Sequence, residues 1–321
     1  MSPVLSPSPH FQLHQLADGV YAALALDSGA AVSNAGIVDL GDRTLVYDTF
    51  LTPKAATDLR LAAETLTGRV ISYVINSHWH NDHIRGNQVF SPETEILCTR
   101  TTRRLMETEG IAELQDDSEN ALSQMKAMEA RLPLETDPSA VEETSRWVTY
   151  FRALAESTPK MKLRMPTWCF EGRLFFHGSV RSAELIEIGP GHTQNDSVLF
   201  LPEEKTAFVG DLVFVRSHPY LAASSLDEWL KALDKIEELD AAVIVPGHGP
   251  IGGPQDIGWM RRYILDLQVQ AARIAASKNP EEKLKDPPIP EAYAGWKLAR
   301  FYGANLRALV QNPTPTNGSA S

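Results

Sequence analysis

The stretch INSHWHNDHIRGN, residues 75–87, places four residues that can bind a metal within six positions: His78, His80, Asp82 and His83. The apolar run RVISYVIN just before and into this stretch predicts a buried strand. The chain has nine histidines, so a third of them stand in this one loop. Ligand sites in folds built from strands and helices form beyond the carboxyl ends of the strands. We therefore expect a functional site here.

Three later strand ends carry further metal-binding residue types. His192 lies in GPGHTQNDS after the run SAELIEIG, Asp211 ends the run KTAFVGD, and His248 lies in PGHG after AAVIV. A single histidine after a strand is more often a hydrogen-bonded structural residue than a ligand. Five histidines and two aspartates at four strand ends are better explained by metal binding. A catalytic zinc uses about three protein ligands and an open position, so this set suffices for two ions that share one ligand.

Catalysis by a pair of metal ions agrees with the absence of motifs for other catalytic mechanisms. Two divalent ions lower the pKa of a bridging water toward neutrality and create a hydroxide nucleophile without serine or cysteine. The chain has no GxSxG turn, no P-loop and no GxGxxG turn with an acidic partner. The sequence therefore predicts metal-assisted hydrolysis.

The motifs HWHNDH, GHT, GD and PGHG, in this order, resemble those of the metallo-β-lactamase-fold hydrolase superfamily over about residues 12–265. The resemblance implies an α/β fold, a four-layer αβ/βα sandwich with a dinuclear metal site between two sheets. It implies that His78, His80 and His192 hold the first metal, and that Asp82, His83 and His248 hold the second. It also implies that Asp211 bridges the metals and that Asp48, at the end of TLVYD, braces the histidine loop.

Asp211 also indicates a branch of the family. The true β-lactamases of this fold commonly have Cys or Ser at that position and are exported, whereas the N-terminal sequence here has no basic and apolar signal segment. The chain is thus more similar to the glyoxalase-II-like and lactonase branches, and we expect it in the cytoplasm. The expected cofactors are two zinc ions, with iron or manganese as alternatives, since imidazole and carboxylate suit all three.

The favoured activity is hydrolysis of an acyl bond, in a lactone, ester or β-lactam-like amide of a small molecule. Asp82 is the expected catalytic residue, which orients the nucleophile and passes its proton to the leaving group. One alternative is a mononuclear iron oxidoreductase of the persulfide dioxygenase type, in which the second ligand set would have no use. A third hypothesis, a binding protein without catalytic activity, is the weakest, because both sets of metal ligands would then have no catalytic use.

A glutathione-thioester hydrolase is the second alternative, and it would need a cationic recess for the carboxylates of its substrate. Four basic residues could supply one or could simply face solvent on a helix: Arg261, Arg262, Lys297 and Arg300. A helical insertion rich in Leu, Met and aromatic residues instead predicts a partly apolar roof. We therefore expect an uncharged or weakly charged substrate, with a lactone first and a β-lactam as a side activity.

The composition of the chain argues against some classes of binding partner. With 30 basic and 41 acidic residues the net charge is −11, which argues against a nucleic-acid partner. No apolar run is long enough to span a membrane. The two cysteines, Cys98 and Cys169, lie in strand-like apolar segments and are expected to be buried thiols.

The pattern along the chain predicts a single domain over 11–311 between disordered tails at 1–10 and 312–321. A helical insertion is expected over 99–165, with helices near 99–109, 117–131 and 138–156, and a helical extension over 256–311. His218 and Tyr220 follow Asp211 on a loop, and either could donate a hydrogen bond to substrate unless the loop merely faces solvent. Aromatic residues of the extension predict packing on the domain or a homodimer contact through helical segments.

Overall fold

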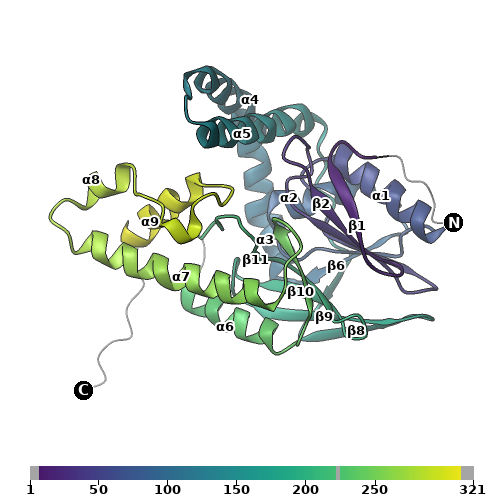
Figure 1. The fold of residues 1–321 in the computed structure, drawn as a ribbon. Helices are drawn as coiled ribbons and strands as arrows, with labels where there is room; N and C mark the ends of the chain where they lie inside the picture. Colours follow the sequence, from purple (N-terminus) through teal and green to yellow (C-terminus); the bar gives the residue numbers. More distant parts are fainter. Residues whose placement is uncertain (1–6, 222–224, 312–321) are drawn as a thin grey trace.

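The computed structural model describes residues 7–221 and 225–311 and has the predicted αβ/βα sandwich architecture (Figure 1). The first sheet has seven strands in the order of the sequence: β1 (Phe11–Ala17), β2 (Val20–Ala25), β3 (Ala35–Asp39), β4 (Thr44–Tyr47), β5 (Tyr73–Ile75), β6 (Glu95–Thr99) and β7 (Trp168–Phe170). The second sheet has five strands in the order β12 (Val243–His248), β11 (Thr206–Phe214), β10 (Asp196–Leu201), β9 (Ser182–Gly189) and β8 (Arg173–His177).

The inner faces of the two sheets share one hydrophobic core. Leu45 and Tyr47 of β4 pack there with Leu185 of β9 and Phe208 of β11, and all four are buried. Alternate residues along a strand point to opposite faces, so the remaining apolar residues of the same strands are available to helices outside. This accounts for the nearly continuous apolar runs in the sequence.

Helix α1 (Pro53–Thr67) covers the outer face of the first sheet. It begins at Pro53 because the Thr52 hydroxyl accepts a hydrogen bond from the Ala55 N–H and proline suits the first turn of a helix. It ends at Gly68, whose φ of 69° lies in the left-handed region that glycine adopts without strain.

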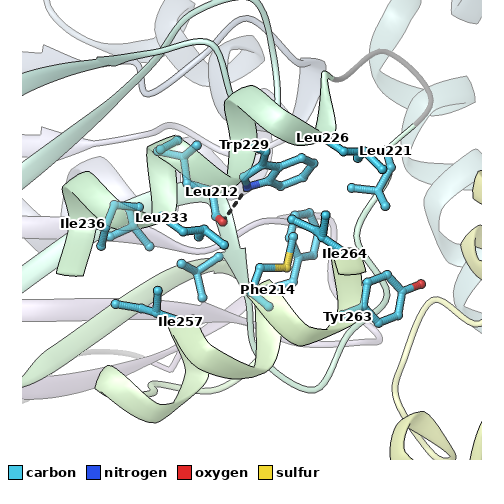
Figure 2. Packing of buried hydrophobic residues seen from close by; sticks show 14 of the residues in the cluster. Leu212, Phe214, Leu221, Leu226, Trp229, Leu233, Ile236, Ile257, Tyr263 and Ile264 are labelled. Carbon is cyan, nitrogen blue, oxygen red and sulfur yellow. Dashed lines mark hydrogen bonds between the residues drawn. The ribbon is translucent and has the colours of Figure 1, made fainter. Parts of the chain in front are cut away.

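Helices α6 (Leu226–Glu237) and α7 (Pro254–Ala275) cover the outer face of the second sheet. Figure 2 shows Trp229 of α6 at the centre of this packing, between the strand residues Leu212 and Phe214 and the apolar face of α7. The Trp229 indole N–H donates to the carbonyl of Leu212 at 2.9 Å, so the buried ring leaves no polar atom unpaired.

Between β6 and β7 the chain leaves the sandwich as a helical insertion, with α4 and α5 side by side (Figure 1). Its helices are α3 (Arg100–Leu105), α4 (Ile111–Arg131) and α5 (Pro138–Ser157). The sequence predicted a break between residues 109 and 117, but a π-helical turn over Met106–Gly110 joins α3 directly to α4. The break was wrong because residues 111–116 are good helix formers and Gly110 is tolerated within the helix.

The C-terminal extension packs back onto the domain through aromatic residues. Helices α8 (Pro280–Lys285) and α9 (Arg300–Gln311) contact α7. Tyr293 and Tyr302 are buried, and the Trp296 ring stacks on Tyr263 of α7 with centroids 5.5 Å apart. Within the described part of the chain, none of the helices is long and apolar enough to cross a membrane.

Two expectations need correction. The predicted N-terminal tail extends too far, because His10 is buried, its Nδ1 accepts from the Ala30 N–H at 3.2 Å, and strand β1 follows at once. Residues 1–6 and the predicted tail over 312–321 lie outside the described residues. Cys98 is buried as expected, but Cys169 is exposed because β7 is the edge strand of its sheet.

Candidate metal centre

The histidine loop begins where β5 ends and is held by Asp48. One Asp48 oxygen accepts from the Ser77 N–H at 2.8 Å, and the other accepts from the Ser77 hydroxyl at 2.7 Å. The second oxygen also lies 2.8 Å from Nδ1 of His83. If Nδ1 of His83 carries the proton, its Nε2 is free to bind a metal. Asp48 reaches this position with a φ of 60°, a conformation that Asp tolerates better than most residues.

Four of the predicted ligands form one group: His78, His80, His192 and Asp211. Nδ1 of His80 lies 3.1 Å from Nε2 of His78 and 2.9 Å from Nε2 of His192. Asp211 Oδ2 lies 3.3 Å from the same His192 nitrogen. One ligand atom from each of the four residues thus lies within 4.8 Å of the others, which is the donor arrangement of a metal site.

The other three predicted ligands form a neighbouring group: Asp82, His83 and His248. Asp82 Oδ2 lies 3.3 Å from Nε2 of His248, and Asp82 Oδ1 lies 3.7 Å from Nε2 of His83. Asp211 Oδ1 is 3.1 Å from Nε2 of His83, while its Oδ2 is 3.3 Å from Nε2 of His192 and 3.4 Å from Nε2 of His248. Asp211 therefore contacts histidines of both groups, as a bridging carboxylate would.

Two buried atoms at the junction of the groups fit a bound cation. Nε2 of His83 and Oδ1 of Asp211 are both fully buried and lie 3.1 Å apart, but neither makes a well-aligned hydrogen bond among the described residues. Polar atoms of this kind are costly to leave unpaired in a protein interior. A divalent ion would satisfy both, so the residues present fit metal binding.

The histidines of the first group favour their neutral forms. Burial lowers the pKa of His80 to about 4 and that of His192 to about 3, and it holds the pKa of His78 well below its usual value. Only a neutral imidazole has a free lone pair for a metal. These three histidines could therefore bind a cation without first having to lose a proton.

The second group has the opposite electrostatics. Burial opposes the charge on His248, but the nearby carboxylates of Asp211 and Asp82 outweigh it and raise the His248 pKa to about 10. The pKa of His83 is likewise raised well above its ordinary value. Protons on His83 and His248 thus balance two buried carboxylates in the metal-free chain. Divalent cations would replace these protons.

A cavity of about 760 Å³ opens directly above the two groups. Five of the seven predicted ligands line it: His80, Asp82, His192, Asp211 and His248. Its other walls include Trp147 and Tyr150 of α5 in the insertion, as expected of a partly apolar roof, and Phe301 of α9. A small molecule in this cavity would lie against the candidate metal centre.

The insertion also contacts the histidine loop through a polar network that the sequence did not reveal. Asn81 Nδ2 donates to the hydroxyl of Tyr150 at 3.1 Å and to Asp117 at 3.4 Å. Buried Arg85 donates to the same Asp117 carboxylate at 2.5 Å. Burial raises the pKa of nearby Glu113, which lies in the cavity wall, to about 8. The insertion thus fixes the loop that carries Asp82.

The two predicted substrate-binding residues lie in different surroundings. Tyr220 lines the cavity and is partly exposed. His218 is fully buried, is absent from the cavity wall, and places Nδ1 2.9 Å from the hydroxyl of Tyr263. Its ring packs among aromatic residues of the C-terminal extension, which the sequence could not place beside it.

Comparison with known proteins agrees with this geometry. A 62-residue segment, 19% of the chain, is 37% identical to the beta-lactamase-like protein 2 homolog of Caenorhabditis elegans, covering 20% of that protein. A match of the same length and share is 34% identical to the atrochrysone carboxyl ACP thioesterase of Aspergillus fumigatus, covering 19% of it. These matches span only about a fifth of the curated relatives.

The fold likeness extends further than these sequence matches. A metallo-beta-lactamase from Pontibacter korlensis superposes with a TM-score of 0.58 at 17% identity, over 80% of this chain and 99% of that one. The sequence matches the metallo-beta-lactamase superfamily over residues 28–97 and 133–248, more than half of the chain. These two matched ranges include the histidine loop and every other predicted ligand. The chain therefore belongs to the metallo-β-lactamase superfamily.

Proposed function

We propose that this protein is a hydrolase that holds two divalent ions and cleaves an acyl bond in a small molecule, such as a lactone, an ester or a β-lactam-like amide. The observation that carries the proposal is Asp211, whose carboxylate contacts histidines of both ligand groups at the cavity. Zinc is the preferred ion, and iron or manganese would suit the same imidazole and carboxylate donors.

The first ion would be held by His78, His80 and His192 and the second by Asp82, His83 and His248, with Asp211 shared. Ions held there would supply a nucleophile from water near neutral pH and would polarise the acyl carbonyl.

Asp82 is the residue proposed to handle protons. Its carboxylate lines the cavity, and its Oδ2 lies 3.3 Å from His248 at the border of the two ligand groups. From this position it can orient the attacking water and carry a proton to the leaving group. The Ser33 hydroxyl donates to the Asp82 carbonyl, and the Asn81 contacts to the insertion hold the preceding residue. Both restrict the loop, so the carboxylate is positioned before substrate binds.

A thioester is the second candidate substrate. One relative matched over a short segment is named a thioesterase, and basic residues line the cavity as well as aromatic ones. Hydrolysis of a thioester also begins with attack on a polarised acyl carbonyl. The thiolate that leaves is less basic than the alkoxide that leaves from an ester. The glutathione-thioester alternative therefore belongs in the same substrate panel.

A mononuclear iron oxidoreductase has less support. One iron held by the first group would leave Asp82, His83 and the partly exposed His248 beside each other without a second cation. Elemental analysis of protein purified without added metal tests this directly. About two divalent ions per chain would support the hydrolase, and one iron per chain without zinc would overturn it.

The activity test is a single panel on zinc-loaded protein, with a metal-stripped sample as control. It contains an acyl-homoserine lactone, a simple aryl ester, lactoylglutathione, a chromogenic cephalosporin and a phosphodiester. Turnover of any acyl substrate that disappears on metal removal supports the proposal. Turnover of the phosphodiester alone would refute acyl specificity.

A further inference from the structure

The basic residues near the C-terminus fall into two groups. Lys297 and Arg300 line the cavity, whereas Arg261 pairs with Asp234 at 2.8 Å on the outer surface. Arg146 of α5 and Arg216, in the loop after β11, also line the cavity. Four cationic side chains thus line the cavity, together with the acidic residues Asp27, Asp82, Glu113 and Asp211. Opposite charges in contact neutralise each other, so only cations without an acidic partner would attract an anion.

Two of these four cations are already paired. Asp27, which also lines the cavity, accepts from Nζ of Lys297 at 2.6 Å and from Nε of Arg146 at 3.4 Å. Arg146 makes a further ion pair with Glu143 at 3.0 Å. Burial acts to raise the Asp27 pKa, but the two donors outweigh it and lower the pKa, so the carboxylate stays ionised. These pairs join the insertion to the C-terminal extension.

The other two cations, Arg216 and Arg300, have no such partner. No carboxylate of the described residues lies within 4.0 Å of either guanidinium. Arg300 is held instead by the ring of Trp147, whose centre is 4.0 Å from the guanidinium carbon. Arg216 is joined through the backbone to the segment that carries Arg300, because its carbonyl accepts from the Lys297 N–H at 3.0 Å.

An aromatic wall connects these arginines with the candidate metal centre. The Phe301 ring lies 5.6 Å from Trp147 and 5.4 Å from Tyr220, and Tyr150 lies 5.4 Å from Trp147 on the side of Asn81. All four rings line the cavity. They form an apolar surface that a ring or short chain of a substrate could cover.

We propose that Arg216 and Arg300 form an anion subsite, which binds an acidic group of the acyl substrate while the aromatic wall holds its apolar part. A carboxylate is the simplest such group, since a guanidinium fork matches its two oxygens. This inference rests on the proposed function, and it narrows the expected uncharged or weakly charged substrate to one that carries an acidic group.

The kinetic test uses two matched substrates. One is a mono-nitrophenyl ester of a linear dicarboxylic acid, and the other is the same ester with its free carboxylate methylated. The wild-type protein should show about a tenfold higher kcat/KM for the charged ester, decreasing with added salt, because both guanidinium groups are partly exposed. The preference should vanish in the Arg216→Gln/Arg300→Gln double variant, survive partly in Arg300→Lys, and remain in Arg262→Gln, a surface control that pairs with Asp266.

A binding test separates this inference from the proposed function. Calorimetry compares phenylbutyrate, its amide and a phenylalkyl phosphonate on the zinc-loaded protein. Tighter binding of either anion than of the amide, lost in the double variant, supports the subsite even if no ester is hydrolysed. A phosphonate bound more tightly than the carboxylate would identify a phosphorylated ligand. Unchanged anion binding and unchanged ester preference in a folded double variant would overturn the subsite and leave the hydrolase proposal standing.

Discussion

Replacing Asp48 by Asn tests how the histidine loop prepares the candidate metal centre. The carboxylate interacts with the Ser77 N–H, the Ser77 hydroxyl and Nδ1 of His83. An amide oxygen can keep the first contact, and the hydroxyl can turn to Nδ1 of His78, which is 2.9 Å away. The amide NH₂, however, would face the N–H at Nδ1 of His83. This donor–donor contact is unfavourable.

His83 escapes the contact by moving its proton to Nε2, the nitrogen that points toward Asp211. In that tautomer it can no longer bind a metal, so the second group loses a ligand while the first keeps all of its own. Outer contacts of this kind change metal affinity by about 10–100-fold, or about 1.4–2.7 kcal/mol. We expect a loss of this size at one site only.

Competition titration with a zinc chelator measures the two affinities, and elemental analysis after dialysis measures the stoichiometry. Asp48→Asn should retain about one ion under conditions where the wild-type protein retains two. Asp234→Asn is the matched control, because Asp234 is largely exposed on α6 and pairs only with Arg261. Wild-type affinity at both sites of a folded Asp48→Asn protein would refute the tautomer argument.

Three further predictions follow from the same structure. Asp82→Asn, measured with enough zinc to fill both groups, should lower kcat by about 10²–10⁴-fold on any acyl substrate of the panel; near-wild-type turnover would remove Asp82 from proton transfer. Burial raises the Glu113 pKa from 4.5 to about 8, so as pH rises the unfolded chain releases this proton first and the wild-type protein loses stability between these values. The pKa shift alone corresponds to about 5 kcal/mol, but the side chain is 32% exposed, so solvent reduces the effect. We therefore expect the free energy of unfolding of Glu113→Gln to exceed that of the wild type by about 1–2 kcal/mol more at pH 8 than near pH 4.5. A difference from urea unfolding that is the same at both pH values would contradict this. Trp229→Leu removes a fully buried ring and leaves the Leu212 carbonyl without its donor, so urea unfolding should show a loss of about 3 kcal/mol; a loss below about 1 kcal/mol would mean that the core repacks.

The ligand set of the candidate metal centre could be predicted from the sequence because each ligand stands next to a local signal. His192 and His248 lie at or just beyond the ends of β9 and β12, as predicted, and strand ends of one fold gather at the same edge. Asp211 was predicted to end its strand, but it lies within β11, which continues to Phe214. Helix α1 was equally readable, since Thr52, Pro53 and Gly68 act on the backbone within one turn. Helix ends and strand-end ligands depend on residues that are neighbours in the sequence, so they can be predicted from the sequence alone.

The walls of the cavity were decided by tertiary packing. Lys297 meets Asp27 across 270 positions, and Arg300 lies over Trp147 of a different helix. No periodicity or cap indicates which face of a helix will meet which distant loop, because that choice depends on how whole helices pack. His218 shows the same limit, since it follows Asp211 closely in sequence but is buried against Tyr263 by the C-terminal extension. Local patterns determined which residues can bind metal, and long-range packing determined what surrounds them.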